Sequence, residues 1–214
     1  RYKDLGVTRE AHRDHGPREP VHGVSWAGYS PRRMRCPLRL PQRLQIDLLD
    51  FFRTGRFDCL RLGQTRELIL HNFPDPDDWG PAGRATGVSD APIWRYGNIE
   101  LHFEADQLWM ICSDYVAELD GGPSLALDRW ILDGQGRPLL PVVLEALSRE
   151  RIDFAKSTRM YPDGASDVTL TLSSGVALHF SLPSEADLDV AARHRGDQNG
   201  MRLTSFELRQ SRPT

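Results

Sequence analysis

Residues 93–114 read I-W-R-Y-G-N-I-E-L-H-F-E-A-D-Q-L-W-M-I-C-S-D, and this pattern predicts three short β-strands joined by tight turns. In the middle strand apolar and polar side chains alternate, as they do on a strand with one buried face. The apolar face carries Ile99, Leu101 and Phe103, and the polar face carries Glu100 and His102. We therefore expect a meander with one face covered by helices or by another sheet.

The segments between and after these strands support the same meander. Gly97-Asn98 separates the first two strands, and both residue types tolerate the positive φ angles of a two-residue hairpin turn. Residues 104–107 supply the second turn. The third strand, residues 108–112, is apolar throughout, which favours a position at the centre of a sheet or coverage on both faces.

A weaker copy of the pattern follows in the second half of the chain. Residues 168–172 and 176–180 flank a Ser-Ser-Gly turn, and residues 201–208 return as a third strand. Leu178-His179-Phe180 repeats Leu101-His102-Phe103. We expect an α+β fold of two helix-plus-antiparallel-meander units in tandem, an arrangement consistent with internal duplication.

The chain divides into four predicted parts. Residues 1–40 form a basic, proline-rich and largely irregular arm, because four prolines interrupt any periodic pattern there. Residues 41–120 form the first α+β unit, and residues 138–210 form the second. Between them, residues 121–137 are a linker that contains a bridging strand or a segment packed on the seam at residues 130–132.

Helices are expected at three places before the strands. Leucine and phenylalanine recur every three or four residues over 42–53, which is the pattern of an amphipathic helix. Thr65 is a good N-cap for a second short helix that ends before Pro74. A third helix begins near Pro141, a residue that the first turn of a helix tolerates.

Composition places the chain among ordinary globular proteins, with 27% charged and 39% hydrophobic residues. No apolar run approaches the roughly 18 residues of a spanning helix, so we expect a cytoplasmic protein without a membrane contact. Charge is unevenly distributed. Residues 1–40 hold nine Lys and Arg against four Asp and Glu, whereas the rest holds 18 against 26. A basic arm precedes an acidic body.

Cysteine and histidine spacing predicts neither a disulfide framework nor a metal site. Cys36, Cys59 and Cys112 are odd in number and isolated, without the paired spacing of thiolate ligands. The segment 83–87 lacks the Lys-Ser/Thr ending and the preceding strand of a phosphate-binding loop. We therefore expect no cofactor.

The run G-Q-T-R-E-L-I-L-H-N-F-P-D-P-D-D-W at residues 63–79, followed by I-W-R-Y-G-N-I-E-L-H-F, resembles a known helix-then-meander layout. That layout is shared by outer-membrane assembly lipoproteins of the SmpA/BamE type and by β-lactamase inhibitory protein. The resemblance covers residues 60–111 and departs at Phe73-Pro74, where those families have Leu-Gly. It implies a binding module without catalysis. The chain also resembles small bacterial immunity and antitoxin proteins.

The first functional prediction is a non-catalytic protein-binding module of the immunity, antitoxin or regulatory type. An acidic body suits a partner with a basic surface, because complementary charge steers association. The predicted contacts are carboxylates and aromatic anchors of the body: Asp75, Asp77, Asp78, Trp79, Trp94, Asp163, Asp187 and Asp189. Both tryptophans could instead be core residues.

Two alternatives remain open from the sequence. One is an accessory subunit of a nucleoprotein assembly that touches nucleic acid through Arg32, Arg33 and Arg35 of the arm. The other is an enzyme or small-molecule-binding protein with a site between the two units, around His102, Trp109 and His179. No activated nucleophile converges with these histidines in the sequence, so no catalytic residue is predicted.

Overall fold

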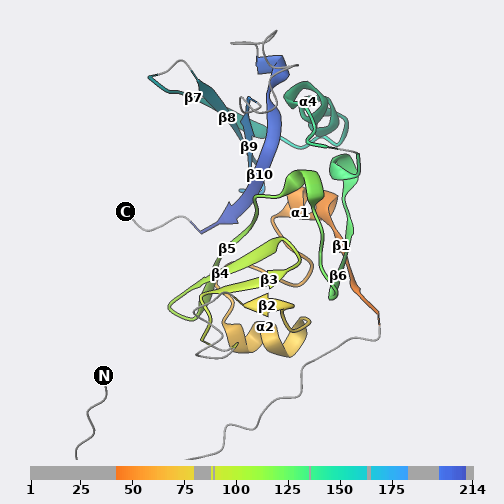
Figure 1. Ribbon diagram of the computed structural model, residues 1–214, viewed down its shortest axis with the longest axis vertical. Coiled ribbons are helices and arrows are strands. Elements are labelled where there is room, and N and C mark those ends of the chain that lie inside the picture. Colours follow the sequence, from red (N-terminus) through yellow and green to blue (C-terminus); the bar gives the residue numbers. More distant parts are fainter. Residues whose placement is uncertain are drawn as a thin grey trace, which may run out of the picture. The chain divides into compact units, whose positions relative to one another are not determined.

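An eight-stranded antiparallel sheet organises the protein (Figure 1). The computed structural model describes residues 42–79, 88, 90–134, 136–162, 165–182 and 198–210. All of these belong to one unit of contacts, residues 37–214. The predicted basic arm, residues 1–40 with Arg32, Arg33 and Arg35, lies outside the described residues.

The first four strands of the chain's main sheet form one half of it, and the last four form the other half. Listed from edge to edge, the order is β2 (Asp78–Trp79), β3 (Ile93–Tyr96), β4 (Ile99–Glu104), β5 (Gln107–Ser113), β10 (Arg202–Arg209), β9 (Ala177–Ser181), β8 (Ser166–Leu172) and β7 (Phe154–Met160). Every neighbouring pair is antiparallel. The two predicted meanders are thus one continuous sheet, joined where β5 pairs with β10.

The central meander forms as its sequence predicts. Gly97, at φ +59°, turns the chain between β3 and β4, and Tyr96 pairs with Ile99. Ala105 and Asp106 both have positive φ, 46° and 69°, which is the two-residue turn that matches strand twist. The predicted alternation in β4 is confirmed, since Ile99, Leu101 and Phe103 are buried and the residues between them are half-buried.

Three α-helices occur in the described residues: α1 (Leu48–Thr54), α2 (Arg66–Asn72) and α4 (Leu140–Arg149). The predicted caps of the second helix and the first-turn proline of the third are confirmed, because the Thr65 side chain accepts from Leu68 N and Pro141 lies in the first turn of α4. The first helix begins later than predicted. Asp47 caps it by accepting from Leu49 N and Asp50 N, and residues 44–47 are extended.

Local propensity could not reveal the small parallel sheet in which those extended residues take part. β1 (Leu44–Asp47) pairs with β6 (Leu125–Asp128), far along the chain. Of the two alternatives expected for residues 130–132, the strand does not form, since Trp130–Leu132 is a short 3-10 helix, η2. Trp130 packs against the core, with its ring 6.0 Å from that of Phe52. Two further 3-10 turns are η1 (Val116–Glu118) and η4 (Gln198–Gly200).

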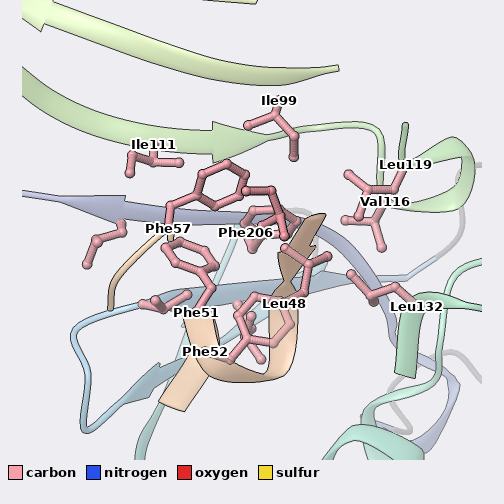
Figure 2. Packing of buried hydrophobic residues seen from close by; sticks show 14 of the residues in the cluster. Leu48, Phe51, Phe52, Phe57, Ile99, Ile111, Val116, Leu119, Leu132 and Phe206 are labelled. Carbon is pink, nitrogen blue, oxygen red and sulfur yellow. The ribbon is translucent and has the colours of Figure 1, made fainter. Parts of the chain in front are cut away.

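One hydrophobic core runs beneath both halves of the sheet (Figure 2). Phe51 and Phe52 of α1 meet Phe206 of β10 edge to face, with ring centroids 6.0 and 5.5 Å apart. In the same cluster, α2 contributes Ile69 and α4 contributes Val143. The helices therefore cover one face of the sheet, and the fold is α+β with more strand than helix. Within the described part of the chain, no helix has the length and apolarity needed to cross a membrane.

Candidate functional site

The opposite face of the sheet carries polar side chains at its centre. Alternation that buries Leu101 on β4 turns Glu100 and His102 to this face, which we call the open face. On the neighbouring central strands the open face carries Cys112 and Glu207. The helices in the described residues pack their buried side chains into the core on the other face.

A hollow of about 350 Å³ lies on the open face at the joint between the two halves. Titratable or charged side chains from four adjacent strands and from Asp114, just after β5, dominate its lining: Glu100, His102, Cys112, Asp114, His179, Glu207 and Arg209, alongside Met110, Ser205 and Phe206. Both histidines of the predicted site, His102 and His179, line this hollow. Trp109 stands beside it, with its ring 6.2 Å from that of His102.

Strand register explains why these side chains meet. Glu100 pairs with Cys112 across β4 and β5, and Cys112 pairs with Glu207 across β5 and β10. Paired residues of an antiparallel ladder point to the same face, so the three form a row across the centre of the sheet. His102 and His179 lie on the outer strands of this group, paired with Met110 and Ser205.

The first half of the hollow is a chain of contacts around Glu100. Arg95 Nε donates to Glu100 Oε1 at 2.9 Å, and Glu100 Oε2 lies 2.8 Å from His102 Nε2. The same histidine nitrogen lies 3.6 Å from Cys112 Sγ. The imidazole is only 18% exposed, and the Glu100 carboxylate and the Trp109 ring contact it, while Arg95 holds Glu100.

The second half of the hollow has a different set of contacts around Glu207. Arg209 Nε lies 3.2 Å from Glu207 Oε1, and His179 Nε2 lies 3.5 Å from the same oxygen. The other nitrogen of that ring, Nδ1, is 3.2 Å from Thr169 Oγ1. This half has no thiol in the position that Cys112 takes in the first half, because Glu207 occupies it.

The environment of the Cys112 thiol lowers its reactivity. Burial, followed by the negative charges of Glu100, Asp114 and Glu207, raises the pKa of Cys112 to about 12. The side chain therefore stays protonated near neutral pH. It is a poor nucleophile in this state, which argues against covalent catalysis by Cys112.

The predicted acidic contact surface at Asp75, Asp77 and Asp78 does not line the hollow. Asp77 accepts from Gly97 N at 3.3 Å and from Ser124 Oγ at 2.6 Å, so its carboxylate braces the turn between β3 and β4. Asp78 lies 3.8 Å from Arg95, the residue that also holds Glu100. Asp75 is half-buried. These carboxylates have internal contacts, besides any that a partner would add.

The two predicted aromatic anchors have different environments. Trp94 has no exposed surface, its indole N–H donates to Val88 O at 2.8 Å, and its ring packs against Phe103. A side chain buried in this way offers no surface to a partner. Trp79 is half-buried in the edge strand β2 and packs partly against the core. Asp163, Asp187 and Asp189 lie outside the described residues.

The sequence analysis missed the contributions of Cys112, Glu207 and Arg209 to the site. Their signal is weak, because it consists only of polar residues at alternate positions in two strands that a long stretch of chain separates. A prediction that β5 pairs with β10 would have been needed to bring them together. Comparison of the chain with models of known protein families, with curated proteins and with solved structures finds no match.

Proposed function

We propose that this chain is a non-catalytic protein-binding module whose partner docks on the open face of the sheet and places a polar side chain in the hollow. The observation that carries the proposal is the hollow itself, whose lining includes the half-buried Glu100, His102, His179 and Glu207 of the central strands. Polar residues are usual on the solvent side of an antiparallel sheet, so alternation alone does not indicate binding. What supports binding is that titratable side chains of low exposure converge on one hollow, with Glu100, His102 and Glu207 at 25%, 18% and 19%.

The lining favours a group carried by a larger partner. Sites for small molecules are mostly apolar, enclose most of the ligand and begin at roughly 300 Å³. This hollow is near that lower limit, at about 350 Å³, and its lining is mainly polar. The lining holds three carboxylates, Glu100, Asp114 and Glu207, and one cation, Arg209. The neighbouring Arg95 offsets the charge of Glu100 through a contact at 2.9 Å. A hydrogen-bond donor or a cationic side chain of the partner suits this environment.

The proposal includes the class of module, which is an immunity, antitoxin or regulatory protein. Proteins of these classes bind a partner without catalysis. The resemblance to SmpA/BamE-type lipoproteins and β-lactamase inhibitory protein implies the same. Asp78 pairs with Arg95, which pairs with Glu100, so Asp78 is the residue of the predicted acidic surface that lies on the open face and best fits this arrangement. Trp79 pairs with Trp94 and lies on the core face.

Internal duplication also belongs to the proposal, and strand register supports it. Cys112 pairs with Glu207 at the joint of the two halves. His102 pairs with Met110, two residues before Cys112, and His179 pairs with Ser205, two residues before Glu207. The two histidines thus take corresponding places about the β5–β10 joint. Duplication of a helix-plus-meander unit would produce this correspondence.

A test requires variants that block the hollow without disturbing the core. Ser205→Arg would fill the hollow, and Arg209→Glu would reverse a charge at its rim, where the side chain is 65% exposed. Val142→Arg is the matched control, because Val142 is 50% exposed on α4, on the helical side of the sheet. Far-UV circular dichroism melts show which variants keep the fold.

The measurement is quantitative mass spectrometry of proteins captured from the source organism by tagged wild type and variants. We expect a stoichiometric protein that the wild type and Val142→Arg retain and that Ser205→Arg loses. Arg209→Glu should retain it at least as well, because the added negative charge favours a cationic group. Retention by Ser205→Arg, or loss with Arg209→Glu, would contradict the proposal. Loss with Trp79→Ala alone would move the contact to the acidic surface, and loss only on deletion of residues 1–40 would favour the nucleoprotein subunit.

A small-molecule-binding protein is the second candidate, because both histidines line the hollow. Native mass spectrometry of the protein purified from its source tests it in the same samples. A bound mass that disappears in Ser205→Arg and persists in Val142→Arg would favour this candidate over a protein partner.

A further inference from the structure

One side of the hollow brings three chemically different metal-ligand atoms close together. The ligand atoms of Glu100, His102 and Cys112 all lie within 4.8 Å of one another. They are a carboxylate oxygen, an imidazole nitrogen and a sulfur atom. Glu207, which pairs with Cys112 across the joint, has its own contacts with His179 and Arg209.

The backbone of two central strands fixes this group. Glu100 and Cys112 are directly paired residues of β4 and β5, and His102 follows Glu100 by two residues on the same face. β3 and β10 flank these strands, so neither is at an edge of the sheet. A site on such strands is more rigid than one on loops and needs little rearrangement to receive an ion.

Two donor separations can be compared with those around a tetrahedral transition-metal ion, and the third is within 4.8 Å. Zinc lies about 2.3 Å from thiolate sulfur and about 2.0 to 2.1 Å from imidazole nitrogen or carboxylate oxygen. Tetrahedral angles then separate sulfur and nitrogen by about 3.5 Å, and nitrogen and oxygen by about 3.3 Å. The observed separations are 3.6 Å for Cys112 Sγ to His102 Nε2 and 2.8 Å for His102 Nε2 to Glu100 Oε2. A shift of about half an ångström in the carboxylate would accommodate the ion.

Outer contacts already orient two of the three donors. Arg95 holds Glu100 Oε1 at 2.9 Å, which leaves Oε2 directed towards His102. The ring of Trp109 meets the ring of His102 at 81°, edge to face, and limits its rotation. Contacts of this kind around a ligand set commonly tune metal affinity by about 10 to 100-fold.

We propose that Glu100, His102 and Cys112 bind a zinc-class divalent ion through Oε2, Nε2 and Sγ. Sulfur and nitrogen donors select such an ion over Mg²⁺ and Ca²⁺, which take oxygen ligands. Three protein ligands leave the fourth tetrahedral position facing the hollow, where water or an external ligand can coordinate. The inference does not depend on the proposed partner, since it concerns only this chain and the ion.

Binding moves protons in a defined way. Cys112 coordinates as thiolate, so the thiol proton leaves for solvent or buffer. His102 coordinates through the lone pair of Nε2, so its single remaining proton is on Nδ1. Glu100 coordinates as the carboxylate and gives up its contact with Nε2. The reaction therefore releases about one proton per ion and involves no oxidant or reductant.

Cobalt(II) titration of the metal-free full-length protein tests the site, because thiolate ligation to cobalt produces a charge-transfer band in the near ultraviolet. We expect one ion per chain, the band in the wild type, and its displacement by zinc. Cys112→Ser should abolish the band. His102→Ala and Glu100→Gln should weaken zinc binding by at least about tenfold in competition titrations.

The other half of the sheet provides matched controls. His179→Ala removes the histidine in the corresponding place, and Cys59→Ser removes a half-exposed free thiol elsewhere. Both variants should keep the band and the zinc affinity. Thermal melts of each variant, with and without zinc, provide a second readout, since an ion that binds only the folded state raises Tm.

Three results would overturn the proposal. The first is no charge-transfer band in the folded wild type at saturating cobalt. The second is a band that survives in Cys112→Ser, which would place the ion at another thiol. The third is an equal loss of zinc affinity in His179→Ala and His102→Ala, which would place the ion elsewhere in the hollow.

Discussion

Removing the ring of Phe206 should destabilise the whole sheet, because this side chain connects its central strand to helix α1. Phe206 is completely buried and meets Phe51 and Phe52 edge to face, at centroid distances of 6.0 and 5.5 Å. Truncation of a buried phenylalanine to alanine costs about 3 to 5 kcal/mol. The two ring contacts, each worth about 0.5 to 1.5 kcal/mol, place Phe206→Ala in the upper part of that range. Phe206→Leu keeps most of the volume and should cost about 1 to 3 kcal/mol.

The assay is guanidinium unfolding followed by tryptophan fluorescence and by far-UV circular dichroism. All five tryptophans precede residue 131, so fluorescence reports on the part of the chain before α4, whereas circular dichroism reports on the whole chain. Because one core underlies both halves, the two signals should give one coincident transition. Leu68→Ala is the control, since Leu68 is 48% exposed and its loss should cost within about 0.5 kcal/mol. A cost for Phe206→Ala below about 1 kcal/mol, or separate transitions, would refute the reasoning.

Three further predictions concern single sites. Gly97→Ala should lower the free energy of unfolding by at least about 1 to 3 kcal/mol in denaturant melts, because φ is +59° and a Cβ atom would meet Asp120 O; an unchanged midpoint would contradict this. Arg66→Met should cost about 1 to 2 kcal/mol in the same melts, because the buried guanidinium loses its contact with Asp106 at 2.9 Å; a gain in stability would show that burying the charge costs more than its contacts return. The third concerns alkylation of Cys112, measured against pH with a chelator present in a variant whose other two cysteines are serine. Its rate should rise about tenfold per pH unit without levelling near pH 8.5, because burial raises the pKa of Cys112 to about 12. A plateau of the rate near pH 8.5 would contradict the burial argument.

The local pattern of the sequence was enough to predict the central meander. Alternation in β4 placed Leu101 in the core, and Gly97-Asn98 placed the first turn. Both signals depend on neighbours within a few residues, and so does the cap at Thr65. Sequence patterns are most informative at this range.

The missed elements depend on partners far along the chain. Residues 44–47 continue the helical spacing of α1, yet they are extended because they pair with β6. The edge strand β7 gave no alternation to detect, since every one of its residues is exposed. Likewise, the histidines of the hollow could be singled out from a repeated triplet, but Cys112 and Glu207 could not be placed together without knowledge of the β5–β10 joint.

The row of polar residues across the sheet centre is in tension with stability. Glu100 and Glu207 flank the buried Cys112 on adjacent strands, and partial burial of two carboxylates is unfavourable unless they are paired. Arg95 and Arg209, at 2.9 and 3.2 Å from the two carboxylates, offset these charges and make the row tolerable. Local conflicts of this kind concentrate at functional sites, because elsewhere substitution removes them without loss. Glu100 and Cys112 of this row are two of the three proposed ion ligands, and Glu207 lines the proposed binding hollow, so both proposals concern residues that carry this conflict.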